Sequence, residues 1–331
     1  MDAKITKQRL GRMLSYDWLK IIGVIVLVIV FWWLIFTMTG TGITPSQQFT
    51  VFNHYANVTV DYGPFSQHLQ DSVDNGVFSY EVIEPELIDL STAGNQVDFI
   101  CTTRFDNSQG DMILIPNITD VQQTTETTSW TYVESFFSRY RQHIVSWDEY
   151  MAEARAYLNG YFYGDYTSGE LNEEKAAADF RARVKKNKDK RFRKESKLQA
   201  GIQAEYARLN KYRDEFMQFE KYLQDGVVAL TEVVGRDMET GEPFIRQDTG
   251  EYAFKANYAL NICPDESKMP GLKDKVNVYY EIQTENGKKK TSAQDMCVML
   301  FSLKEMDQDF QYETTLYLNA LIKTCLATTQ A

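Results

Sequence analysis

The sequence predicts an α/β protein with an N-terminal transmembrane helix, and three observations carry this prediction. Residues 21–38 contain no charge and no strong helix breaker. Strand-type and helix-type patterns alternate over 49–128 and return over 236–331, which is typical of a sheet covered by helices. Residues 129–235 follow an almost uninterrupted helical pattern, so a largely helical region is inserted into the sheet-forming part of the chain.

The apolar run 21–38 is predicted to cross a membrane. At about 1.5 Å of rise per residue, a helix over this run approaches the ~30 Å thickness of a bilayer core. A buried core helix is the alternative, but such a helix would carry a polar stripe, and the run has none. Charged and indole side chains suit the two ends of a span. The expected anchor residues are Lys20, Ile21, Trp32, Trp33 and Met38.

Charge on either side of the run predicts its orientation. Residues 1–20 form a basic tail with five basic and two acidic residues, a net charge of +3, and such tails stay cytoplasmic. A cleaved signal peptide is the alternative, but its apolar region is shorter. We therefore expect a single-pass cell-membrane protein with a cytoplasmic N-terminus, a short linker over 39–48 and an extracytoplasmic C-terminal region.

The region beyond the run is acidic. Residues 40–331 contain 30 basic and 44 acidic residues, a net charge of −14, so no nucleic acid is expected as a partner. Four cysteines fall in this region without C-x-x-C spacing, which argues against a structural zinc site. An oxidising compartment permits disulfides, and buried free thiols explain the apolar surroundings equally well. The four are Cys101, Cys263, Cys297 and Cys325.

Several segments of the acidic region have assignable patterns. Alternating or continuous apolar residues predict strands over 49–60, 97–103, 111–116, 258–264 and 276–284. Two Thr-Gly turns predict a hairpin over 234–254, and four-residue apolar spacing predicts a closing helix over 312–326. The helical tract from Asn172 to about residue 223 is long for one globular helix, so a break is expected near 187–190.

The densest charge lies inside that tract. Residues 181–197 contain ten basic and two acidic residues, a net charge of +8. Such a run is typical of a solvated, salt-bridged helix face; contact with anionic lipid or a wall polymer, or with nucleic acid, are the alternatives. The residues expected to touch a partner or polyanion are Lys185, Lys186, Arg191, Arg193 and Lys194.

No signature of catalysis occurs in the sequence. It lacks G-x-S-x-G, a P-loop, H-E-x-x-H and a glycine-rich dinucleotide turn, and its three histidines have no second ligand at metal spacing. We therefore expect a protein without enzymatic activity, catalytic residues, bound metal or cofactor. One aromatic loop, GYFYGDYTSG over 160–169, suits ligand binding, because tyrosine has an apolar face and a polar tip. The alternative is that its rings fill the seam between helices and sheet.

The order of these elements resembles that of extracellular solute-binding proteins of the type 2 periplasmic-binding superfamily. The resemblance lies in the strand FTVFNHY, a helix, the strand SYEVIEP, the apolar segment QVDFICTT, a helical insert and the late segment GKKKTSAQDMCVMLFSL. The N-terminal LSYDWLKIIGVIVLVIVFWWLIF looks like the anchor of Gram-positive membrane proteins that carry such domains. The chain departs from the family in having no lipid-attachment cysteine and no recognisable ligand-binding motif.

The resemblance implies two lobes and a cleft between them. One lobe is α/β (49–128 plus 236–331), and the other is helical (129–235). The ligand of such proteins is a sugar, peptide or amino acid that is presented to an ABC transporter permease, and the lobes close around it by a hinge motion. The expected ligand-binding residues are Asn53, Tyr55, Thr102, Thr103, Arg104, Tyr161, Tyr163 and Tyr166. The alternative function is a structural or assembly subunit that contacts a partner through its helical arm.

Overall fold

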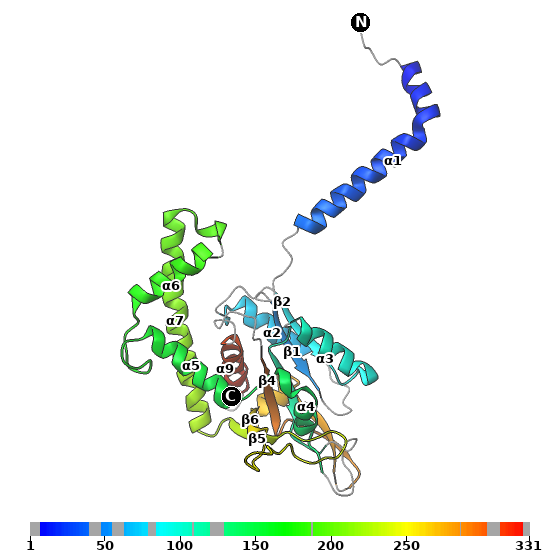
Figure 1. Cartoon of the computed structure of the whole chain (residues 1–331). Coiled ribbons are helices and arrows are strands. Elements are labelled where there is room, and N and C mark those ends of the chain that lie inside the picture. Colours follow the sequence, from blue (N-terminus) through cyan, green and yellow to red (C-terminus); the bar gives the residue numbers. More distant parts are fainter. Residues whose placement is uncertain are drawn as a thin grey trace. The chain divides into compact units, whose positions relative to one another are not determined.

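A computed structural model (Figure 1) describes residues 7–39, 48–54, 63–78, 84–107, 109–119, 129–186, 188–284, 286–302 and 312–326. The chain forms two compact units, Met1–Thr44 and Pro45–Ala331. The second unit has mixed α/β content, which confirms this part of the predicted fold class.

The first unit contains one long helix, α1 (Lys7–Thr39). Within the described part of the chain, no helix has the length and apolar character that crossing a membrane requires. The prediction of a transmembrane helix over 21–38 is therefore wrong.

The residues expected to anchor that span lie on α1. Lys20, Trp32 and Trp33 are exposed, the two indoles at 65% each. The side chains of Ile21 and Met38 lie outside the described residues.

The second unit is built on a sheet whose described strands run in the order β2-β1-β3-β9-β6-β5, with the short β4 (Ile144–Val145) also pairing with β9. The first three strands are parallel, and β9, β6 and β5 each run antiparallel to the preceding strand. Their bounds are β1 (Gln48–Asn53), β2 (Glu84–Asp89), β3 (Met112–Pro116), β5 (Ala229–Val234), β6 (Lys255–Asn261) and β9 (Met296–Phe301). A separate two-stranded sheet joins β7 (Tyr280–Gln283) and β8 (Lys289–Ser292).

Helices cover both faces of the large sheet (Figure 1). Successive side chains of β3 alternate between the faces: Met112 and Leu114 join one core, and Ile113 and Ile115 join the other. The first core includes α5, α7 and α9, and the second includes α3 and α4. The bounds of the described helices are α2 (Gly63–Asp74), α3 (Val97–Asp106), α4 (Tyr132–Tyr140), α5 (Trp147–Tyr161), α6 (Glu173–Lys186), α7 (Glu195–Gln224), α8 (Pro270–Asp274) and α9 (Glu313–Leu326), with 3₁₀ turns η2 (Gly94–Gln96), η3 (Arg141–His143) and η4 (Lys190–Phe192).

The first core runs without interruption from the sheet into the helical region that was expected to form a second lobe. Trp147 of α5 is fully buried, its Nε1 donates to the Val298 carbonyl of β9 at 3.0 Å, and its ring stacks on Phe219 of α7 at 5.5 Å. These contacts join the sheet to the helices that were expected to form a separate lobe. Residues 45–331 are accordingly one compact unit.

One predicted strand is a helix. Residues 97–103, which read as a buried strand, form most of α3. Cys101 and Phe105 are buried at four-residue spacing, whereas Phe99 is 73% exposed, and this is the burial pattern of a helix on a surface. The other strand predictions overlap β1, β3, β6 and β7. The closing helix is confirmed by α9, and the helix break is confirmed by the gap between α6 and α7.

All four cysteines are free and buried, which decides between the alternatives that the sequence left open. Burial raises the pKa of each thiol to about 12. The reactive thiolate is therefore scarce at neutral pH, and these cysteines act as apolar core residues.

Replacing Trp147 tests the continuous core. Trp147→Ala is expected to lower the free energy of unfolding by about 3–5 kcal/mol, because it removes a large buried side chain. Urea titration followed by circular dichroism would measure this. Tyr163→Ala, at a side chain that is 59% exposed, is the control and should change stability by less than about 0.5 kcal/mol. Independent unfolding of the sheet and of the helical region would contradict the single core.

Asp111 at the start of β3 makes stability depend on pH. Its buried carboxylate accepts from the Thr50 amide at 2.7 Å, and burial, with a smaller contribution from Glu313, raises its pKa to about 7. The folded state therefore keeps a proton that the unfolded state loses near pH 4, so this contribution to stability is present at low pH and lost as pH rises to about 7.

The substitution Asp111→Asn removes this titration. Wild-type stability should fall relative to the variant between about pH 4 and pH 7, by up to about 1.4 kcal/mol per pH unit. Urea midpoints measured across this range would check it, and two parallel pH profiles would refute it.

Candidate interaction site

The helical arm is formed by α6, η4 and the first half of α7, up to Arg208. It has its own small core, in which Phe180 and Ile202 pack with partly buried neighbours that include Phe192. Gly201 allows this close approach, because a Cβ there would lie 2.6 Å from the Phe192 ring and 2.7 Å from the Phe180 ring. The arm is therefore a folded hairpin of helices that presents its far end to solvent (Figure 1).

The far end of the arm, residues 181–197, is the basic tip. Two of its cations are paired: Arg183 with Glu205 at 3.0 Å and Arg191 with Asp189 at 2.8 Å. The others form no ion pair with any residue that the structure describes. These exposed and uncompensated side chains are Arg181, Lys185, Lys186, Lys188, Lys190, Arg193, Lys194 and Lys197.

Every basic residue that the sequence nominated for partner contact is therefore exposed on one end of one hairpin. Lys185 and Lys186 end α6, Arg191 lies in η4, and Arg193 and Lys194 precede α7. The expected salt-bridged face is formed only in part. Asp179, two residues before the tip, pairs with Lys175 one turn earlier, and that hydrogen bond lowers the pKa of Asp179.

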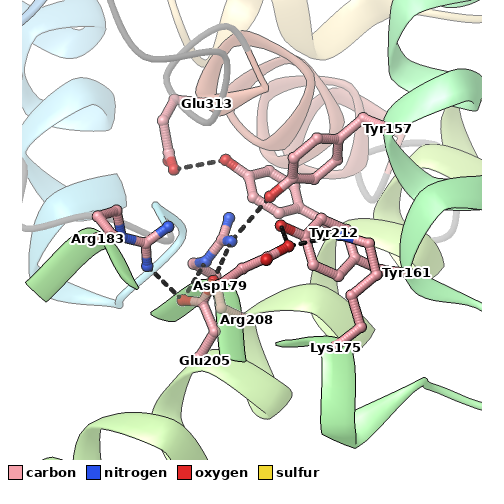
Figure 2. A network of polar contacts seen from close by, with 9 residues as sticks. All are labelled: Tyr157, Tyr161, Lys175, Asp179, Arg183, Glu205, Arg208, Tyr212 and Glu313. Carbon is pink, nitrogen blue, oxygen red and sulfur yellow. Dashed lines mark hydrogen bonds and ion pairs between the residues drawn. The ribbon is translucent and has the colours of Figure 1, made fainter. Parts of the chain in front are cut away.

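A buried ion cluster lies where the arm meets the rest of the unit (Figure 2). Glu205 and Arg208, one helical turn apart on α7, are 6% and 7% exposed and form two hydrogen bonds of 2.9 and 2.7 Å. Arg183 of α6 donates to the same carboxylate, and Arg208 also donates to the Tyr157 hydroxyl of α5 at 2.9 Å. One buried carboxylate thus holds α6 and α7 together, and its partner arginine reaches α5.

Tyrosines extend this cluster on both sides (Figure 2). The Tyr161 hydroxyl donates to Asp179 at 3.0 Å, and the Lys175 ammonium lies 4.3 Å from the centre of the Tyr161 ring. Toward the sheet, the guanidinium of Arg208 lies over the Tyr212 ring, whose hydroxyl donates to the fully buried Glu313 of α9 at 3.0 Å. The network therefore connects four helices, α5, α6, α7 and α9, at the base of the arm.

The residues expected to bind a small ligand are distributed over separate elements. Asn53 is buried at the end of β1, whereas Thr102 and Thr103 are exposed on α3. Arg104 pairs with Glu86 at 2.8 Å and also donates to Gln109. Tyr55 lies outside the described residues.

The aromatic loop has structural partners. Tyr161 belongs to the network described above, and Tyr166 is buried, with its ring against Phe216 and its hydroxyl donating to Glu220 at 2.5 Å. Tyr163 alone of the three nominated tyrosines is exposed. This arrangement corresponds to rings that fill the seam between helices.

One cavity beside these helices is small. It lies between α5, α7 and α9, is lined by Tyr157, Tyr212 and Tyr312 among others, and has a volume of about 10 Å³. That volume holds about one water molecule and no sugar or amino acid. In the described ranges, no three histidine, cysteine or acidic side chains are grouped so that they could hold a metal ion.

No protein-family model, curated protein or solved structure matches this chain. The resemblance to solute-binding proteins therefore stays a prediction, and the arguments about function rest on this chain's own residues.

The sequence pointed to the basic tip but not to the buried network. No motif or charge pattern in the sequence singled out Glu205 or Arg208. The available signal was their position on the apolar face of α7, between the buried Ile202 and Tyr212, since charges on that face must find partners.

Removing the shared carboxylate should destabilise the arm. Glu205→Gln leaves Arg208 buried without a counter-charge, and the expected loss in the free energy of unfolding is about 3–5 kcal/mol. Urea unfolding is the measurement.

Two companion variants make this result specific. Asp189→Asn removes the partner of the exposed Arg191 and should cost no more than about 1 kcal/mol. The double variant Glu205→Leu/Arg208→Met should recover most of the lost stability, because it removes both buried charges. Equal losses in the single and double variants would mean that the pair has no such role.

Proposed function

We propose that this protein is a non-enzymatic interaction protein that contacts an acidic partner through the basic tip of its helical arm. The observation that carries the proposal is the group of eight exposed cations that have no acidic partner among the described residues. Such a concentration of one charge attracts an oppositely charged surface and speeds the encounter with it.

The construction of the arm supports the proposal. The buried pair Glu205–Arg208 and its tyrosine partners form a rigid base, so the tip is held at a defined place relative to the sheet. A solvated charge run needs no such support. An arm that presents a charged surface to a partner does, because a rigid arm loses less conformational entropy on binding.

Presentation of a small solute to a transporter remains a prediction from the order of elements. The nominated ligand residues are dispersed, and none of them lines the small cavity between α5, α7 and α9. The basic tip has the stronger physical support.

Charge reversal at the tip tests the proposed function. Zero-length carboxyl–amine cross-linking should join the tip lysines of the full chain to the carboxylates of added polyglutamate, which is used as a probe for any acidic partner. The triple variant Lys185→Glu/Lys186→Glu/Lys194→Glu should reduce these adducts about tenfold or more, since like charges then face each other.

The matched control reverses three exposed lysines outside the arm, Lys268→Glu/Lys275→Glu/Lys288→Glu, and should keep the adducts at the wild-type level. Adducts that are equally abundant in all three proteins would refute the proposed function.

A further inference from the structure

We propose that the acidic partner is the surface of an anionic lipid bilayer, which the basic tip binds without inserting into it. This inference rests on the proposed function and names the class of its partner. Three features of the arm support it: the kind of cation, the distance between the tip and the acidic body, and the absence of exposed large apolar or aromatic side chains on the described part of the tip.

The uncompensated cations are mostly lysines. Six of the eight are lysine, and only Arg181 and Arg193 are arginine. Lysine is a compact point charge without the planar fork with which arginine recognises one carboxylate or phosphate in a fixed geometry. Lysines spread over the ends of two helices and the turn between them match a diffuse negative surface, and headgroups of an anionic leaflet form such a surface.

The tip stands away from the acidic remainder of its own unit. Residues 45–331 without the tip contain 20 basic and 42 acidic residues, a net charge of −22. The buried residues that α7 contributes to the first core begin at Tyr212. Lys197 of the tip lies about 22 Å from Tyr212 along the same helix. This distance exceeds the Debye length of about 8 Å at physiological salt.

A planar polyanion can therefore touch the tip while most of the acidic body stays outside the range of repulsion. A polyanion that wraps around the unit would meet net negative charge.

The side chains on the tip also favour a lipid surface over nucleic acid as the partner. Single-stranded nucleic acid is bound by basic grooves that contain exposed aromatic rings. On the described part of the tip, the one aromatic ring belongs to Phe192, which is half-buried and packs against the buried Phe180 inside the arm. No exposed large apolar side chain there could enter the hydrocarbon. The contact is therefore electrostatic, reversible and sensitive to salt.

The test places a fluorescent probe on the tip of the full chain. Ser196→Cys introduces an exposed thiol, and the four native cysteines are buried, so maleimide labelling is selective. Energy transfer from this probe to acceptor-labelled headgroups reports the approach of the tip to vesicles of phosphatidylcholine alone or mixed with phosphatidylglycerol. The tip triple reversal leaves α1 unchanged and therefore separates binding by the tip from binding by α1.

The expected result is energy transfer that rises with the phosphatidylglycerol fraction and is lost between about 50 and about 500 mM NaCl. In the Ser196→Cys background, the tip triple reversal should weaken binding to the mixed vesicles about a hundredfold, at about fivefold or more per lysine. The Lys268/Lys275/Lys288 triple reversal should bind like the parent.

Energy transfer that does not depend on the phosphatidylglycerol fraction, or that is unchanged in the tip triple reversal, would overturn the lipid assignment. Tighter binding of the tip to a short DNA duplex than to mixed vesicles at equal salt would also overturn it, in favour of nucleic acid. Failure with vesicles while the cross-linked adducts still require the tip would leave the proposed function standing and reject the lipid surface. If neither the energy transfer to vesicles nor the cross-linked adducts depended on the tip lysines, both proposals would be rejected.

Discussion

The packing of α5, α7 and α9 against one face of the sheet is the constraint on which the rest of the structure depends. Trp147 is its centre, since its ring stacks on α7 while its indole nitrogen is bonded to β9. This packing fixes the C-terminal half of α7 in the core of the unit. The N-terminal half of the same helix then has to extend beyond the core, and with α6 it forms the arm.

The charge distribution follows from this division of α7. Buried charges occur where the arm leaves the core, and they are paired because an isolated charge there would cost several kcal/mol. Charges at the far end need no partner for folding, because water solvates them. The uncompensated lysines of the tip thus contribute little to stability. Their concentration on one end of an otherwise acidic unit is the feature that points to a binding role.

Local patterns predicted many elements correctly and failed where two structures share one pattern. The four-residue spacing of the apolar residues in α9 allowed only one interpretation. Residues 97–103 did not, because a short apolar run fits a buried strand and a surface helix equally well. In the helix, Phe99 is left exposed to solvent. The helix forms because α4 and the sheet cover Cys101 and Phe105, and only the tertiary structure supplies these neighbours.

The sequence by itself determined the mixed α/β content, the break between α6 and α7 and the concentration of positive charge at residues 181–197, because periodicity, helix ends and charge density are local properties. Tertiary structure alone decided that the helical region shares a core with the sheet, that the tyrosines of 160–169 mostly serve packing, and that Glu205 and Arg208 are buried. Each of these depends on side chains that are distant in sequence and meet only in the folded unit. The basic tip depends on both levels: the sequence places its lysines close together, and the fold leaves them exposed without acidic partners.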